Sequence, residues 1–226
     1  MDSDFFKEVR NYFTTEFKQQ IGVSLNEESS SVDKALSAII PLGAASAIQR
    51  VENDKGGMSS VFSMAKSAVS YLPPKPDLAS LHNELAENGI ISELLGKHEN
   101  AVNHAVAKYS GIKNESAGPL MLLGMSVMLK NLGDHASKNN LTPDQLDSYI
   151  TGLKDKAKSE LPEGIKEAGS LFGMSEGSVD DKHVVETVQT DSVQKKNKGW
   201  IFPIIFAVVI VIALIIFSRG CNTYLK

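Results

Sequence analysis

The sequence has one cysteine, Cys221, among 226 residues. A disulfide within the chain is therefore impossible, and no cysteine-based metal site can form. This cysteine usage fits a reducing compartment. Cys221 itself is a candidate for lipidation or for an intermolecular disulfide, and an unmodified thiol is the alternative.

The sequence also has fewer basic than acidic residues. The chain has 23 Lys and Arg against 27 Asp and Glu, a formal net charge of −4. Two of the basic residues, Arg219 and Lys226, follow Trp200, so the part before Trp200 has 21 basic and 27 acidic residues and a net charge of −6. Binding to a phosphate backbone needs clustered Lys and Arg. We therefore expect no nucleic-acid partner.

Two further patterns are absent from the sequence. The first residues, MDSDFFKEVRNYF, are acidic and contain no uninterrupted apolar stretch, unlike a secretory signal peptide. No convincing alternating pattern of a β-strand occurs before residue 200, and apolar residues instead recur at helical spacing. The fold class predicted is therefore all-α. We expect helices over 4–20, 24–51 with a kink or split at Pro41, 58–71, 77–89, 97–109, 119–132 and 142–159, and a short one ending at 172.

Two of these helices have strong local signals. Thr142 and Gln145 form a capping box around Pro143 at the first helical position, and Leu141 and Leu146 occupy the positions of a hydrophobic staple. The segment 119–132 is apolar nearly all round, which is typical of a buried central helix. This segment contains three methionines, Met121, Met125 and Met128. We expect them to pack in the core, and the alternative is that they line a groove for a partner.

The segments that resemble catalytic or phosphate-binding motifs do not have the residue spacing that those motifs require. His98 begins a segment resembling HExxH, but the position four residues later holds Val102, and His104 lies about 240° around the helix from His98. Gly96-Lys97 lacks the following Ser or Thr of a phosphate-binding loop. Other acidic residues that could act in acid–base chemistry are explained as charged helix faces: Glu84, Glu87 and Asp134 beside His135. We predict no catalytic, cofactor-binding or metal-binding residues and no enzyme activity.

A long apolar run lies near the end of the sequence. Residues 201–217 carry no charge, and 14 of the 17 are Ile, Val, Leu or Phe. As a helix this run would be about 26 Å long, slightly short of a hydrocarbon core of about 30 Å. Trp200 is placed as an interfacial anchor, and Pro203 falls in the first turn, where its missing N–H is tolerated. The run from Ile201 to Phe217 predicts a transmembrane helix over 200–218.

The flanks of this run predict its orientation. Basic residues precede it at Lys195, Lys196 and Lys198, while Arg219 and Lys226 follow it, a weak positive-inside signal. Together with the missing signal peptide, this places the N-terminal part in the cytoplasm. We expect a helical domain over 1–173, a disordered polar linker over 174–199 and a short tail over 219–226.

Two segments of the chain resemble each other. QQIGVSLNEESSSVDKALSAIIPLGAASAIQ (19–49) and AKYSGIKNESAGPLMLLGMSVMLKNLG (107–133) both run from a helix end through Gly and a polar cap into a long apolar helix. With ALSAIIPLGAASAI (35–48) as an early unit and LLGKHENAVNHAVAKYSGIKNESAGPLMLLGMSVML (94–129) as a later one, this layout resembles the bacterial domain of unknown function 937 family. Gly124 stands where a second proline of the pattern is expected.

The resemblance covers roughly residues 5–172 and implies an all-helical fold with no established activity. Some members of the family continue through a similar span, ending in a sequence like SRGC (218–221), into an outer-membrane-protein-A-like domain. Only five residues follow SRGC here.

The expected function is therefore a non-enzymatic, single-span membrane adaptor or scaffold of the bacterial cell envelope, without a cofactor. Its partners would be the lipid bilayer and a protein. Alternatives are a small-ligand-binding or enzymatic helical domain tethered to the membrane, or a eukaryotic tail-anchored protein.

Overall fold

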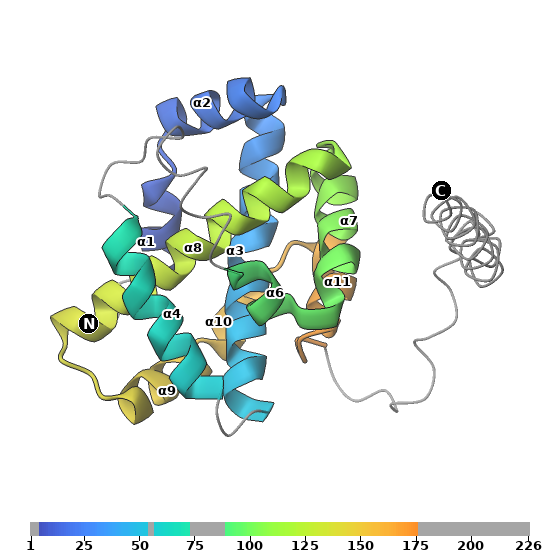
Figure 1. Ribbon diagram of the computed structural model, residues 1–226. Coiled ribbons are helices and arrows are strands. Elements are labelled where there is room, and N and C mark those ends of the chain that lie inside the picture. Colours follow the sequence, from blue (N-terminus) through green and yellow to red (C-terminus); the bar gives the residue numbers. More distant parts are fainter. Residues whose placement is uncertain (1–4, 54–56, 73–88, 176–226) are drawn as a thin grey trace, which may run out of the picture. The chain divides into compact units, whose positions relative to one another are not determined.

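The computed structural model of the chain describes residues 5–53, 57–72 and 89–175 (Figure 1). The chain divides into two units, Met1–Gly177 and Ser178–Lys226, and all described residues belong to the first. Every regular element in the described ranges is a helix, which confirms the all-α prediction. The predicted transmembrane helix, its flanks and the tail lie outside the described residues, as does nearly all of the predicted linker.

The helices of the described ranges follow one another along the chain. They are α1 (Phe5–Tyr12), α2 (Thr15–Leu25), α3 (Ser29–Asn53), α4 (Gly57–Tyr71), α6 (Ile90–Leu95), the 3₁₀ helix η1 (Gly96–His98), α7 (Glu99–Ser110), α8 (Asn114–Lys138), α9 (Pro143–Gly152), α10 (Lys154–Glu160), the 3₁₀ helix η2 (Glu163–Ile165) and α11 (Lys166–Ser170). The predicted helix over 77–89 falls almost entirely outside the described residues.

Helices α3 and α8, each 25 residues long, cross at the centre of the domain (Figure 1). Glycines make the crossing close, because an added Cβ at Gly124 would lie 2.5 Å from Cγ2 of Ile39 and one at Gly43 would lie 3.2 Å from Cγ of Met125. Met121, Met125 and Met128 are fully buried. Core packing is thus the correct interpretation of the methionines, and a methionine-lined groove is wrong.

Pro41 does not split α3, contrary to one form of the prediction. A proline inside a helix removes one backbone hydrogen bond and normally breaks the helix. Here residues 38–48 are buried on all sides. The packing of this apolar segment against α8 and the surrounding helices compensates for the missing bond.

The N-terminal region differs from the prediction in two ways. The expected single helix over 4–20 is divided at Phe13, where Thr14 caps a new helix by accepting the N–H of Phe17 at 3.2 Å. Gly22 does not end α2, which continues to Leu25 and ends where Asn26 takes a left-handed conformation with φ 53°. A capping box from Ser24 to Glu27 is therefore wrong, because Ser24 is still helical.

Later boundaries were predicted better. The capping box is present, with the Thr142 N–H donating to Oε1 of Gln145 at 2.9 Å and the Gln145 N–H donating to Oγ1 of Thr142 at 3.3 Å. Gly111 ends α7 with φ 82°. The helix expected over 142–159 is divided at Leu153 into α9 and α10.

Within the described ranges, one helix is long and apolar enough to cross a membrane, and it is α3. However, 78% of its most apolar 18-residue window is buried inside the domain. We therefore interpret α3 as the core helix of a folded domain. The apolar run over 201–217 lies outside the described residues.

Candidate functional site

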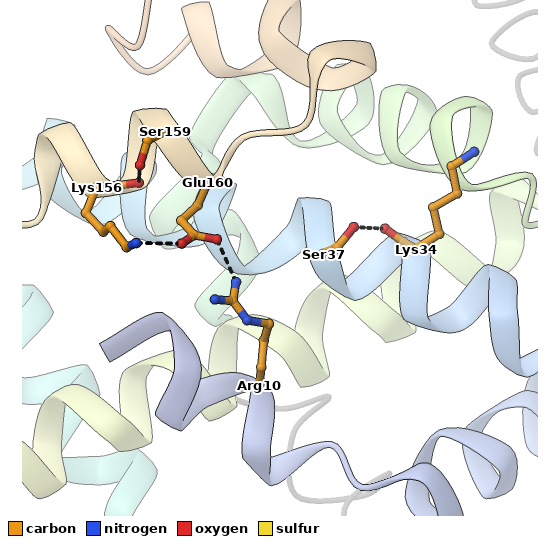
Figure 2. Close-up of polar contacts among 6 residues, drawn as sticks. All are labelled: Arg10, Lys34, Ser37, Lys156, Ser159 and Glu160. Atoms are coloured by element: carbon orange, nitrogen blue, oxygen red, sulfur yellow. Dashed lines mark hydrogen bonds and ion pairs between the residues drawn. The ribbon is translucent and has the colours of Figure 1, made fainter. Parts of the chain in front are cut away.

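One polar cluster of the domain joins α1 to α10. Figure 2 shows Arg10 and Lys156 pointing to the carboxylate of Glu160 from opposite sides. Arg10 Nη1 donates to Oε2 of Glu160 at 2.8 Å, and Lys156 Nζ lies 3.0 Å from Oε1. The two cations thus take both carboxylate oxygens, and the cluster links helices that lie 150 positions apart in the sequence.

The protonation of Glu160 reflects these contacts. Partial burial acts to raise its pKa, but the hydrogen bonds and charges of Arg10 and Lys156 outweigh burial and lower the pKa below its ordinary value. The side chain of Glu160 is only 21% exposed. Glu160 is therefore held as a carboxylate, and it is a poor proton donor for acid catalysis.

The hydroxyl groups around this cluster serve their own helices. Ser37 Oγ donates to the carbonyl oxygen of Lys34 at 2.6 Å, and Ser159 Oγ donates to that of Lys156 at 2.9 Å (Figure 2). Lys34 extends away from Glu160 and its Nζ lies 4.8 Å from the ring centroid of Tyr109. Neither serine has a base beside its hydroxyl in the contacts shown. The main effect of the cluster is to join α1 to α10 through the Arg10–Glu160 contact.

A second polar cluster joins the α2–α3 turn to the start of α8. Oε1 of Glu27 accepts the backbone N–H of Lys113 at 2.9 Å and the hydroxyl of Ser116 at 2.6 Å. Lys113 Nζ donates to the carbonyl oxygen of Asn26 at 2.8 Å. A carboxylate at a helix N-terminus also interacts favourably with the helix dipole. Glu27 therefore caps α8 from a distant part of the chain.

Gly22 makes the geometry of this turn possible. The Glu27 N–H donates to the Gly22 carbonyl oxygen at 2.8 Å, and an added Cβ at Gly22 would lie 2.7 Å from the carbonyl oxygen of Glu27. Only a residue without Cβ fits this approach. The glycine that the sequence offered as a helix stop is instead a packing site for the following turn.

We expect Glu27→Gln to lower the free energy of unfolding by about 1 kcal/mol at pH 7, because the amide keeps the shape but loses the charge-assisted hydrogen bonds. Burial acts to raise the pKa of Glu27, but Ser116 and Lys113 outweigh it and lower the pKa. The carboxylate therefore stabilises the fold fully above pH about 4.3, its ordinary value, and loses this effect as the pH falls through the folded-state pKa.

Denaturant titrations of the full chain at pH 7 and pH 3.5 would measure this. The difference between the wild type and Glu27→Gln should shrink at the lower pH. Glu28→Gln is the matched control, because Glu28 is exposed and its carboxylate has a long contact, 3.4 Å, with the Ser30 hydroxyl. Equal losses for the two variants at pH 7 would contradict the capping role of Glu27.

The residues of the HExxH-like segment lie in different surroundings. His98 packs edge-on against Phe172 with ring centroids 5.9 Å apart, and His104 is exposed on α7. Glu99 accepts a hydrogen bond from Ser92 at 3.1 Å. Among the described residues there is no group of three or more His, Cys, Asp or Glu side chains that could hold a metal ion.

Asp134 and His135 contact different residues. Asp134 forms an ion pair with Lys130 at 2.6 Å, and the His135 ring stacks on Tyr149 with centroids 3.9 Å apart. The other acidic pair, Glu84 and Glu87, lies outside the described residues. So do all the membrane-related residues predicted from sequence, namely Lys195, Lys196, Lys198, Trp200, Ile201, Pro203, Phe217, Arg219 and Cys221.

Sequence reasoning missed both polar clusters. Glu160 and Glu27 are ordinary glutamates in the sequence, and their partners lie 150 and 89 positions away. No spacing rule links such distant residues, and within these clusters only the Lys156–Glu160 pair of α10 has the i, i+4 spacing of a helix ion pair. The described part of the chain is an all-helical domain in which charged side chains connect segments that are remote in sequence.

The comparison with protein families identifies the family of this domain. The family model described as "Bacterial protein of unknown function (DUF937)" matches residues 7–135, more than half of the 226 residues. The chain belongs to this family. The match covers the elements from α1 through most of α8, ends before α9, and does not include an outer-membrane-protein-A-like domain. No curated protein and no solved structure matches the chain.

Proposed function

We propose that this protein is a non-enzymatic adaptor or scaffold, anchored in a membrane by the apolar run 201–217. That run carries the proposal, since 17 successive residues without a charge are rarely accommodated in a folded aqueous domain. The described domain adds support, because the one long apolar helix there is already used as the core of the fold. Anchoring is therefore assigned to the C-terminal run.

The proposed arrangement places the helical domain in the cytoplasm and the short tail beyond the membrane. Lys195, Lys196 and Lys198 before the run support this orientation through the positive-inside rule. The family description as a bacterial protein favours the bacterial inner membrane over a eukaryotic tail-anchored protein. The polar segment 174–199 would act as a tether of about 25 residues.

A role in binding other proteins agrees with the contacts of the two polar clusters, whose side chains join helices of the domain. The Arg10–Glu160–Lys156 and Glu27–Lys113–Ser116 clusters hold helices together. We also propose that the segments 19–49 and 107–133 are two similar helical units, on the likeness of their sequences. Such a helical domain would bind a partner through its outer surface.

In-cell photo-crosslinking of the full chain tests the adaptor role. A crosslinking residue would replace Val23, which is 85% exposed, and in separate variants His104 and Ser148, which are exposed on other helices. The proposal predicts a discrete crosslinked protein from at least one position. Absence of any discrete product from all three, together with saturable binding of a small ligand by the purified chain, would favour the ligand-binding alternative.

A further inference from the structure

The first two helices form a segment that packs on the rest of the domain through one apolar side. We call residues 5–25 (α1 and α2) the N-terminal arm and the remaining described residues the body. Contacts between elements place α1 against α3 and α8, and α2 against α3. Six large apolar side chains of the arm are at most 4% exposed: Phe5, Phe6, Val9, Phe13, Phe17 and Ile21.

Much of the aromatic packing of the arm is internal. The rings of Phe13 and Phe17 stack with centroids 6.0 Å apart, and Tyr12 meets these two rings at 5.7 and 6.2 Å. Burial raises the pKa of Tyr12 to about 12. These contacts join α1 to α2 across the break at Thr14. The arm is therefore cohesive and can move as one unit.

Besides the backbone hydrogen bonds of the α2–α3 turn, two ion pairs attach the arm to the body. Arg10 of α1 pairs with Glu160 at 2.8 Å, with side chains 40% and 21% exposed, and Lys18 of α2 pairs with Asp33 at 2.6 Å, with side chains 23% and 63% exposed. Exposed ion pairs of this kind are weak and are screened by salt.

The body is held together differently. An added Cβ at Gly124 of α8 would lie 2.5 Å from Cγ2 of Ile39 in α3, so these helices approach through their backbones. Helices α4 and α8 approach as closely at Gly133, where an added Cβ would clash with the carbonyl oxygen of Ala65. Interlocked backbone packing of this kind does not open without unfolding the core.

We propose that the N-terminal arm is a latched cover, which opens as a unit while the α3–α8 body stays folded. The latches are the Arg10–Glu160 and Lys18–Asp33 ion pairs, which add to the apolar contacts of the arm and make opening less frequent. Opening would uncover apolar surface of α3 and α8 beneath the arm. A higher ionic strength would then increase the exposure of this surface.

Hydrogen–deuterium exchange of the full chain in detergent micelles tests the proposal, with the variant Arg10→Gln/Lys18→Gln removing both latches. We expect amide exchange in α1 and α2 to accelerate about three- to tenfold while α8 keeps its wild-type rates. Addition of 1 M NaCl should accelerate the arm of the wild type and leave the double variant nearly unchanged.

Lys154→Gln is the matched control. It removes an ion pair with Glu52 at 2.8 Å that has similar exposure, 42% and 37%, and joins α10 to α3 without touching the arm. This control should leave arm exchange at the wild-type rate. Equal acceleration in α8 and the arm, acceleration of the arm by Lys154→Gln, or no acceleration in the double variant would each overturn the proposal.

Discussion

A chain carrying Val209→Arg and Ile212→Arg is expected to move from the membrane fraction to the aqueous fraction. The 14 strongly apolar residues of the run 201–217 favour insertion by about 4 to 8 kcal/mol at most, at roughly 0.3 to 0.6 kcal/mol each. Two arginines near the centre of the span remove about 6 to 8 kcal/mol of this, because each costs about 2.5 to 3.5 kcal/mol and replaces a favourable residue. Insertion then becomes neutral or unfavourable.

Membrane flotation followed by quantitative immunoblotting measures the distribution. The control is Val209→Leu/Ile212→Leu, which changes the same positions and keeps them apolar. This control should float with the membranes like the wild type. Flotation of the double-arginine variant at the wild-type level would contradict the assignment of the run as the anchor.

The second large effect is expected at the approach of α8 to α4. Gly133→Ala should lower the free energy of unfolding by about 3 kcal/mol, the upper end for overpacking a core. The new Cβ would clash with the backbone carbonyl oxygen of Ala65 and lie 2.6 Å from Cγ2 of Val69. A backbone atom cannot rotate away as the end of a long side chain can, so the two helices must separate.

Thermal unfolding of the full chain, followed by circular dichroism at 222 nm, should show a decrease in Tm of roughly 6 to 12 °C for Gly133→Ala. Gly152→Ala is the matched control, because Gly152 is also helical but no atom lies within 4 Å of its added Cβ. It should be neutral or slightly stabilising, as expected for Gly→Ala in open space. A Tm for Gly133→Ala within 2 °C of the control would contradict the close packing of α4 on α8.

Local signals explain which parts of the fold could be predicted from sequence. The capping box at Thr142 and the left-handed stop at Gly111 depend on residues within one helical turn, so they can be recognised without tertiary structure. The burial of Met121 follows from a segment that is apolar on every side. These predictions depended on short-range physical chemistry.

The wrong predictions have a tertiary cause. A continuous helix across Phe13 fits the apolar spacing, but the break there turns the chain so that Phe13 and Phe17 stack with their planes 10° apart. Pro41 predicts a split in an isolated helix, but burial on all sides preserves α3. In both places, packing against other helices decides the outcome.

The polar clusters could not be predicted for a different reason. Glu27 fits a local capping box in the sequence, yet its carboxylate caps α8 at Lys113, 86 positions away. The choice between a local and a distant partner depends on how α3 and α8 cross, which no local pattern contains. The same holds for Arg10 and Glu160, which only the folded domain brings together.

The most direct test of the anchored-adaptor account is protease protection on sealed membranes from cells expressing the full chain, with one tag before Met1 and another after Lys226. The account predicts that the N-terminal tag is digested only when the cytoplasmic face is exposed and the C-terminal tag only from the opposite face. Digestion of both tags from one face, or release of the chain by alkaline carbonate, would contradict a single span with the helical domain in the cytoplasm.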